Sequence, residues 1–394
     1  MSLRIEFVER ATKPGAKVAV LCREFGISRE TGHKWLRRYR EGGHEGLEEQ
    51  SRRPTKSPRA ATEDVILAVL EAREAHPSWG PKKLVELLKR RLRDATPSRA
   101  TIARILVRFG KVRERRRRRG VSVVDSKPRV LAAEPNDVWT IDFKGWWRAK
   151  DGTRCEPLTV RDAHSRYVLL AEVMPAPSMD EVYEKLERLF RKHGVPKKIQ
   201  CDNGAPFIAV HARAGLTRLS ARWVSLGIDV VRSRPGCPQD NGAHERMHRD
   251  MSEEVEARPA ESSAYVQRLV DRWRQQFNHV RPHEALGGRV PAEVYKPALK
   301  RPVRERAFVY PVGWLARRAY GDRGTISVNG CKRRVGRAFV GLNLGVEPLS
   351  EQTHRLWLGP VDLGEIAMPP SIAELDSACS RFIERPMAKK RRAA

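Results

Sequence analysis

The chain has 394 residues, 40% of them hydrophobic, which is enough for buried cores and excludes a fully disordered polypeptide. Domains usually have about 150 residues, so the length predicts two or three of them. The 77 Lys and Arg residues outnumber the 48 Asp and Glu residues and give a formal net charge of +29. A charge so far from neutral indicates a polyanionic partner, most often a nucleic acid. The alternative is a ribosomal-type or merely soluble basic protein.

The six cysteines are scattered and form no C-x-x-C pair, so the sequence suggests neither a zinc ribbon nor a disulfide framework. Reduced thiols are the simplest interpretation. The N-terminus lacks the apolar core of a signal peptide, and no apolar run approaches the roughly 18 residues of a membrane span. These features predict a soluble, cytoplasmic protein that has no membrane partner.

Residues 1–50 have the pattern of a helix-turn-helix domain. Leu3 to Ala11 is expected to form one helix, and apolar residues at helical spacing predict another over residues 18–25. Ser28 is a suitable N-cap for a third, basic helix that ends at Tyr39, the kind of helix that enters a major groove. Gly32 weakens this helix by about 1 kcal/mol, and the sequence offers no reason for it. A helical hairpin with a solvated basic face is the alternative. The expected DNA contacts are Ser28, Arg29, His33, Lys34, Arg37 and Arg38.

A second helix-turn-helix or winged-helix domain is expected over residues 60–111. Thr62 precedes the first helix, Pro81 opens the second helix, and Thr96 and Pro97 start the third. The expected DNA contacts of this third helix are Ser98, Arg99 and Arg104. A basic linker follows over residues 112–134, where an arginine run repels itself and is suited to phosphate contacts. This run contains Arg115, Arg116, Arg117, Arg118 and Arg119.

From residue 135 to residue 300 the pattern changes to strands alternating with helices, typical of a mixed α/β sheet covered by helices. The organising strand is Trp139 to Gly145, which carries Asp142 among apolar residues. A carboxylate in a strand must be desolvated and needs a counter-charge, which either Lys144 or a metal ion would provide. Asp202 ends a later strand, and Glu245 lies near the start of a helix. These three acids form a candidate catalytic and metal-binding triad.

Acids of this kind suit phosphodiester chemistry. Two Mg²⁺ ions about 4 Å apart activate the attacking oxygen, stabilise the leaving oxyanion and hold the phosphate in line. Mg²⁺ prefers carboxylate oxygens and keeps several waters, so two or three acids are sufficient. The glycine turns after Asn203 and Asn241 let a DNA backbone approach. The expected neighbours of the site are Lys144, Asn203, Gly204, Asn241, Gly242, His244, Arg246 and His248.

Three segments carry a resemblance to the integrase core of insertion-sequence DDE transposases, relatives of retroviral integrases with an RNase H-like fold. They are Val138 to Asp142, Cys201 to Phe207, and Arg234 to Arg246, and the segments from Asn278 to His283 and from Pro291 to Tyr295 resemble the region after that core. The two N-terminal helix-turn-helix domains match the same group. Arg213 to Arg222 is interpreted as extra helical material between the second and third acids.

The resemblance implies that Asp142, Asp202 and Glu245 bind Mg²⁺ or Mn²⁺, two ions per active site. The enzyme would bind the terminal inverted repeats of a mobile element, nick the DNA and join the 3′-hydroxyls to target DNA. Double-stranded DNA and a second copy of the chain are the implied partners, in a prokaryotic, nucleoid-associated setting. Retroviral integrases carry an N-terminal zinc site, but no matching His/Cys set precedes residue 120, so we expect no structural zinc.

Short β runs with glycine turns predict a β-rich, barrel-like module over residues 303–367, followed by a basic tail over residues 368–394. The expected β runs are Phe308 to Tyr310, Thr325 to Val328 before the Asn329-Gly330 hairpin signal, and Arg337 to Val340. Three other functions stay open. His244-Glu245-x-x-His248 also fits a zinc-protease motif, the chain could be a DNA-binding regulator with an inactive core, and a nuclease without strand transfer would use the same acids.

Overall fold

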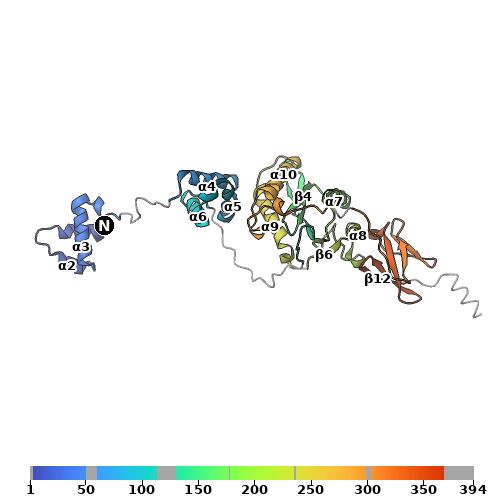
Figure 1. Ribbon diagram of the computed structural model, residues 1–394. Coiled ribbons are helices and arrows are strands. Elements are labelled where there is room, and N and C mark those ends of the chain that lie inside the picture. The colour runs from blue at the N-terminus through green and yellow to red at the C-terminus, as the bar shows by residue number, and fades with distance from the viewer. Residues whose placement is uncertain are drawn as a thin grey trace, which may run out of the picture. The chain divides into compact units, whose positions relative to one another are not determined.

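The computed structural model describes residues 3–49, 60–112, 130–176, 178–234, 237–298 and 303–367 (Figure 1). Its contacts divide the chain into Met1–Ala61 and Thr62–Ala394. The arginine run, most of the linker that contains it and the basic tail lie outside the described residues, and the finer domain boundaries stay predictions. In the described part of the chain, no helix is both long and apolar enough to span a bilayer.

The first unit is a three-helix domain of α1 (Leu3–Ala11), α2 (Val18–Glu24) and α3 (Arg29–Gly42). Ser28 caps α3 as predicted, since its hydroxyl accepts the Thr31 N–H at 3.1 Å. Leu36 is buried, but Trp35 is only partly buried against the core. The structure explains Gly32, because a Cβ there would lie 2.5 Å from Cys22 Sγ and 2.9 Å from Phe7 Cζ. The missing side chain lets α3 pack closely on α1 and α2.

A second three-helix domain begins the other unit, with α4 (Glu63–Ala75), α5 (Pro81–Leu92) and α6 (Arg99–Arg108). Ser98 caps α6 through the Thr101 N–H at 3.2 Å, and Ile102, Ile105 and Leu106 are buried. Thr62 precedes α4 but makes no side-chain capping bond.

The region from Val138 to Val294 contains a mixed sheet with helices on both faces. Its path runs β2-β3-β1-β5-β6, and β4 pairs with β3. The strands are β1 (Val138–Phe143), β2 (Trp147–Arg148), β3 (Arg154–Asp162), β4 (Val168–Met174), β5 (Lys198–Cys201) and β6 (Asp229–Arg232). The β1–β3 and β3–β4 pairs are antiparallel, whereas β1–β5 and β5–β6 are parallel. Parallel neighbours require helical crossovers, and α7 (Met179–His193) and α8 (Arg218–Ser225) supply them.

Residues on the two faces of β1 alternate between two cores. Trp139 and Ile141 pack in one cluster with residues of α7 and α8. The opposite face is covered by α9 (Gly242–Met251), a π-helical turn (Ser252–Glu256) and α10 (Ser263–His279), with α11 (Pro291–Val294) beyond. Since strand side chains alternate with period two, Thr140 and Asp142 lie on the α9 face.

The C-terminal module consists of antiparallel sheets, which confirms the predicted β-rich module, and its described residues form no closed barrel. One sheet has the order β12-β11-β10-β7, and β8 pairs with β9. The strands are β7 (Leu315–Arg318), β8 (Thr325–Val328), β9 (Cys331–Arg334), β10 (Asn343–Pro348), β11 (Thr353–Leu358) and β12 (Val361–Ala367). Its core includes Leu216, Ala221 and Val224, so the module packs against α8.

Two expected β runs in this module are wrong and one is confirmed. The Asn329-Gly330 turn joins β8 and β9, and both residues have the positive φ that a tight hairpin requires. Phe308 to Tyr310 form no strand, because Tyr310 instead lies over Gly345 and its hydroxyl donates to the Asn343 carbonyl at 3.2 Å. Arg337–Phe339 is a 3-10 turn that buries Phe339.

Candidate active site

The strand register brings two of the predicted acids to the same level of the sheet. Thr140 of β1 pairs with Gln200 of β5 in parallel register. Two residues further on, Asp142 and Asp202 are therefore neighbours at the carboxyl ends of strands about 4.8 Å apart. Cys201 belongs to the opposite core cluster, so Asp202 lies on the same face as Asp142.

The Asp142 carboxyl is mostly buried and close to like charges. Its side chain is 20% exposed. Burial and then the negative charge of Asp202 raise the pKa of Asp142 to about 7, and Glu245 adds a smaller upward effect. Burial and the neighbouring carboxylates both favour the protonated form of this carboxyl, and a cation bound beside it would favour the ionised form.

Lys144 does not provide that cation. Its ammonium group forms a salt bridge with Glu256, lies 4.7 Å from the Trp147 ring centroid and is 7% exposed. The structure thus pairs Lys144 with Glu256 instead of with Asp142.

Glu245 lies in the first turn of α9 and is exposed. The segment before this helix is held to the sheet, because Gln200 Nε2 donates to the Asp240 carbonyl at 2.8 Å. Asp240 is itself buried and accepts Arg234 N at 2.9 Å and an Arg234 guanidinium N–H at 2.8 Å. Asn241, the N-cap residue, points its Nδ2 at Asp142 Oδ2 at 3.4 Å, while its Oδ1 is buried without a hydrogen-bond partner.

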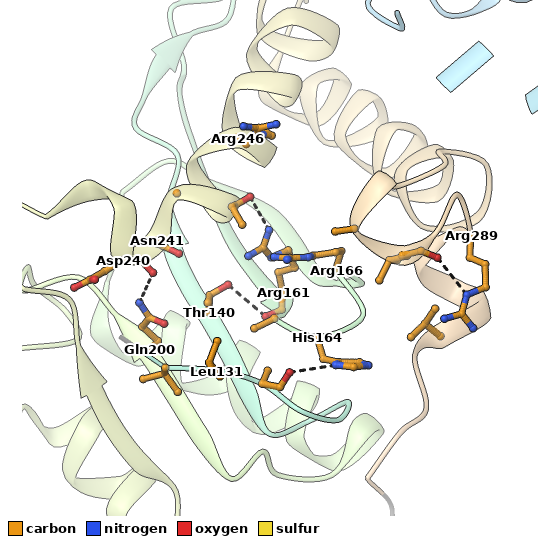
Figure 2. A pocket seen from close by; sticks show the side chains of 18 of the residues that line it. Leu131, Thr140, Arg161, His164, Arg166, Gln200, Asp240, Asn241, Arg246 and Arg289 are labelled. Atoms are coloured by element: carbon orange, nitrogen blue, oxygen red, sulfur yellow. Dashed lines mark hydrogen bonds between the residues drawn. The ribbon is translucent and has the colours of Figure 1, made fainter. Parts of the chain in front are cut away.

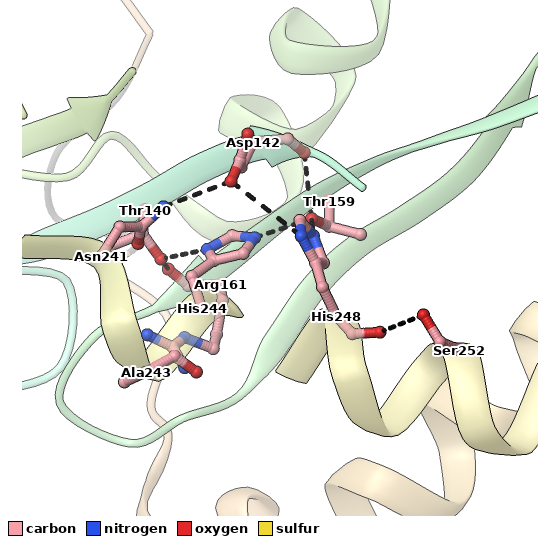
Figure 3. Close-up of polar contacts among 9 residues, drawn as sticks. All are labelled: Thr140, Asp142, Thr159, Arg161, Asn241, Ala243, His244, His248 and Ser252. Carbon is pink, nitrogen blue, oxygen red and sulfur yellow. Dashed lines mark hydrogen bonds and ion pairs between the residues drawn. The ribbon is translucent and has the colours of Figure 1, made fainter. Parts of the chain in front are cut away.

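Threonine hydroxyls and histidine imidazoles form a hydrogen-bonded network next to Asp142 (Figure 3). Thr159 of β3 lies opposite Asp142, and its hydroxyl donates to the Asp142 carbonyl at 3.0 Å. The same oxygen lies 2.7 Å from both His244 Nε2 and His248 Nε2, and His244 Nδ1 lies 2.6 Å from Thr140 Oγ1. One hydroxyl therefore joins the backbone of β1 to two turns of α9.

These contacts are consistent with one set of tautomers. We assign the Thr159 proton to the Asp142 carbonyl, so that both imidazole Nε2 atoms donate to Thr159. Thr140 then donates to His244 Nδ1 at 2.6 Å in preference to the Arg161 carbonyl at 3.4 Å. Burial lowers the pKa of His244 far below its usual value, and burial followed by the charges of Lys144 and Arg161 lowers that of His248 to about 3. We assign both rings as neutral. His248 Nδ1 then presents a lone pair toward Asp142 Oδ2, 4.0 Å away, so the two do not form an ion pair.

The same contacts argue against the zinc-protease interpretation. Both ring nitrogens of His244 are used by threonine hydroxyls, and the residue is fully buried. The structure gives the histidines of the His244-Glu245-x-x-His248 motif a supporting role beneath Asp142.

The donor set fits a divalent cation by its chemistry. It offers carboxylate oxygens, which Mg²⁺ and Mn²⁺ prefer, at a place where negative charge is uncompensated. Within the described ranges, no group of three or more His, Cys, Asp or Glu side chains is arranged to hold a metal ion. The acids are thus electrostatically coupled without forming a closed ligand set.

The turn after β5 holds Asp202 at the edge of the sheet. Gly204 N donates to Asp202 Oδ1 at 3.2 Å, and Asn203 Nδ2 donates to the Ser233 carbonyl at 2.7 Å. A Cβ on Gly204 would lie 3.0 Å from Asp202 Oδ2. The turn needs its small residue because the carboxylate folds back over it.

The predicted DNA contacts of the two helical domains lie mainly at the surface. In α3, only Arg38 is half-buried, and the other five are exposed. Ser98, Arg99 and Arg104 are exposed at the start and on one face of α6. Arg246 is exposed on α9, whereas Gly242 is half-buried.

Sequence reasoning missed Thr140, Thr159, Arg161, Gln200 and Asp240. All five are buried polar residues around the start of α9. A polar residue inside an apolar strand, as in Leu158-Thr159-Val160, was the available signal, because such a group must find a partner.

Comparisons with known proteins agree with this organisation. Models described as an integrase core domain match residues 132–238 and 226–291. A helix-turn-helix domain model matches residues 3–55, and a homeodomain-like domain model matches residues 31–106. The expected combination of helix-turn-helix domains with an integrase core is confirmed.

The chain is similar to two proteins of bacterial insertion elements. It is 26% identical over 251 residues to an uncharacterized 39.2 kDa protein of IS476 from Xanthomonas euvesicatoria, covering 63% of this chain and 69% of that protein. It is 29% identical over 184 residues to an uncharacterized 31.7 kDa protein of IS407 from Burkholderia multivorans, covering 46% of this chain and 63% of that protein. Among solved structures, the catalytic core of BIV integrase is 23% identical, with a TM-score of 0.32, covering 41% of this chain and 93% of that chain.

Proposed function

We propose that this chain, which joins helix-turn-helix domains to an integrase core and resembles insertion-element proteins, is a DNA transposase. It would bind the terminal inverted repeats of a mobile element, nick the DNA ends and join the 3′-hydroxyls to target DNA. The observation that carries this proposal is the convergence of Asp142 and Asp202 at adjacent strand ends beside Glu245.

In this proposal Asp142, Asp202 and Glu245 hold a pair of Mg²⁺ or Mn²⁺ ions. Bound there, such ions activate the attacking oxygen and stabilise the leaving oxyanion. The protein positions the carboxylates: Thr159 holds the backbone of Asp142, and Asn241 approaches its Oδ2 from the start of α9. Neutral His244 and His248 keep α9 against the sheet and take no proton from the acids at neutral pH.

The exposed basic faces of α3 and α6 support recognition of double-stranded DNA by the two N-terminal domains. Two element ends must be brought together for joining, so we also propose that the chain self-associates on DNA. The same proposal implies that the protein is associated with the nucleoid of a prokaryotic cell.

The test is metal-dependent cleavage and strand transfer on duplex DNA carrying the ends of the element. Wild type is compared with Asp142→Asn, Asp202→Asn and Glu245→Gln, and with Asp322→Asn as a control, since Asp322 is an exposed turn residue far along the chain. The expected result is that each of the three triad variants loses both reactions in Mg²⁺ and Mn²⁺ but still binds DNA. Cleavage without joining would establish a nuclease, and DNA binding without any metal-dependent reaction would establish a regulator.

A further inference from the structure

A cavity of about 950 Å³ adjoins the candidate active site (Figure 2). It is lined by residues of β1, β3 and β5, by the start of α9, and by the segment from Ala285 to Val294. Thr140 lines it two residues before Asp142, and Asn241 lines it while its Nδ2 approaches Asp142. Asn241 therefore lies between the cavity and the Asp142 carboxyl.

Four arginines line this cavity: Arg161, Arg166, Arg246 and Arg289. None of them forms a salt bridge with any carboxylate of the described residues. Asp240 is the one acid of the lining, but its side chain has no exposed surface and is bound by Arg234. Asp162 attracts Arg161 and Arg166, and Glu284 lies near Arg246, so the positive charge of the lining is partly offset but exceeds the negative charge.

Arg161 is the most constrained of the four. It is 3% exposed, one guanidinium N–H donates to the Ala243 carbonyl at 2.6 Å, and its buried Nε has no hydrogen-bond partner. Burial and then the charge of Arg166 lower its pKa. Asp162 does not neutralise the pair by contact, since its oxygens accept the N–H groups of Asn136 and Ser165 and the Ser165 hydroxyl.

The backbone at Arg166 is also unusual. Its φ is +66°, in the turn between β3 and β4. The left-handed conformation costs a side-chain-bearing residue about 1 kcal/mol, and glycine would avoid that cost. A strained position that keeps a long cation next to a second buried cation points to a ligand that both can bind.

Polar groups elsewhere in the lining suit a phosphate, while Leu131, Leu286 and Val294 belong to an apolar part of the wall. The start of α9 contributes Asn241, Gly242 and Ala243, and a helix N-terminus carries partial positive charge. Gln200 and His164 add polar groups to the wall. Arginine forks match the geometry of a phosphate group, whose charge would relieve the repulsion between Arg161 and Arg166.

We propose that this cavity binds a phosphate group of the DNA strand that enters the acidic site. The assignment rests on the proposed function only in taking DNA as the substrate. A backbone phosphate held here would fix the register of the strand relative to Asp142, because Asn241 contributes to both places.

The test measures binding of the full-length chain to end-bearing duplex DNA over a range of KCl concentrations, in chelator, so that no reaction occurs. The variant is Arg166→Gln with Arg289→Gln. The matched control is Arg188→Gln, an exposed arginine of α7 outside the cavity. If both arginines serve one phosphate, we expect binding to weaken about tenfold at low salt, as for loss of a charged hydrogen bond. The magnitude of the negative slope of log affinity against log salt should be smaller in the variant than in wild type by about 0.9, the value for one phosphate contact.

An unchanged slope and affinity, equal to those of the control variant, would overturn the assignment. Arg246→Gln, at an exposed site on α9, repeats the comparison if the double variant fails to fold. Inorganic phosphate at constant ionic strength is a separate arm: thermal stabilisation of wild type by phosphate, combined with an unchanged DNA slope, would mean an adventitious ion only. Cleavage of the DNA in Mg²⁺ is measured separately. A reduced salt slope in the variant, combined with no cleavage by wild type, would support the phosphate site and contradict the proposed transposase activity.

Discussion

The raised pKa of Asp142 predicts that the candidate active site destabilises the metal-free protein. Asp142 has a pKa of about 7 in the folded chain, against an ordinary aspartate pKa of 3.8. The folded state therefore holds the proton more tightly than the unfolded state, and its stability falls as pH rises from about 4 through about 7. Asp142→Asn removes the charge and nearly keeps the shape, so we expect this variant to be more stable than wild type at pH 8.

The size of the effect follows from the shift. Raising the pKa from 3.8 to about 7 corresponds to an upper bound of about 4 kcal/mol in folding free energy. The side chain is 20% exposed, and solvent around it screens the like charges. We therefore expect a gain of about 1–3 kcal/mol at pH 8 and almost none near pH 4.

The assay is urea denaturation in chelator at both pH values, with hydrogen exchange of the β1 peptide as a local probe, because a multidomain chain need not unfold in one step. Asp322→Asn is the control for removing an exposed aspartate. Mg²⁺ should raise the stability of wild type at pH 8 and leave Asp142→Asn unchanged. A variant that loses stability equally at both pH values would refute the reasoning, since it would mean that the carboxylate stabilises the fold.

Three further predictions concern the framework. Gly32→Ala should lower the urea midpoint of the first domain despite alanine's better helix propensity, because its Cβ would lie 2.5 Å from Cys22 Sγ; an unchanged or higher midpoint contradicts this. Arg281 is 3% exposed and lies 2.5 Å from Asp250, so Arg281→Ala should cost about 3 kcal/mol in the denaturation of the core, by leaving acids unpaired in a mostly buried place. A loss below about 1 kcal/mol would show that water replaces the guanidinium. His248 has a folded pKa of about 3, so its contribution to stability is present above pH 6.5 and is lost as the pH falls from 6.5 toward 3. His248→Gln should therefore lose less stability than wild type over this pH range. Equal profiles of stability against pH for the two proteins would contradict this prediction.

The local features of this protein could be predicted from its sequence because they depend on neighbours in the chain. Ser28 marks a helix start through its own hydroxyl. The start of α6 was predicted at Thr96 and Pro97, whereas Ser98 is its N-cap. Asn329-Gly330 makes the predicted hairpin turn. Asp142 stood out in the sequence because Asp is depleted in strands, and its role as a metal ligand stays a prediction.

Only the tertiary structure decided what surrounds those acids. Lys144 was an equal candidate to neutralise Asp142 until the fold brought Glu256 to it from more than a hundred residues away. Thr159 and Arg161 are two residues apart on β3 and lie on the face toward α9. Their partners depend on the pairing register of β3 with β1, which the sequence of β3 alone does not specify. The segment at Tyr310 has strand-forming residues yet packs its ring on a glycine of another strand. Sequence pattern reports which groups a segment offers, whereas long-range packing selects the partners, because burial and like-charge repulsion exist only once the segments meet.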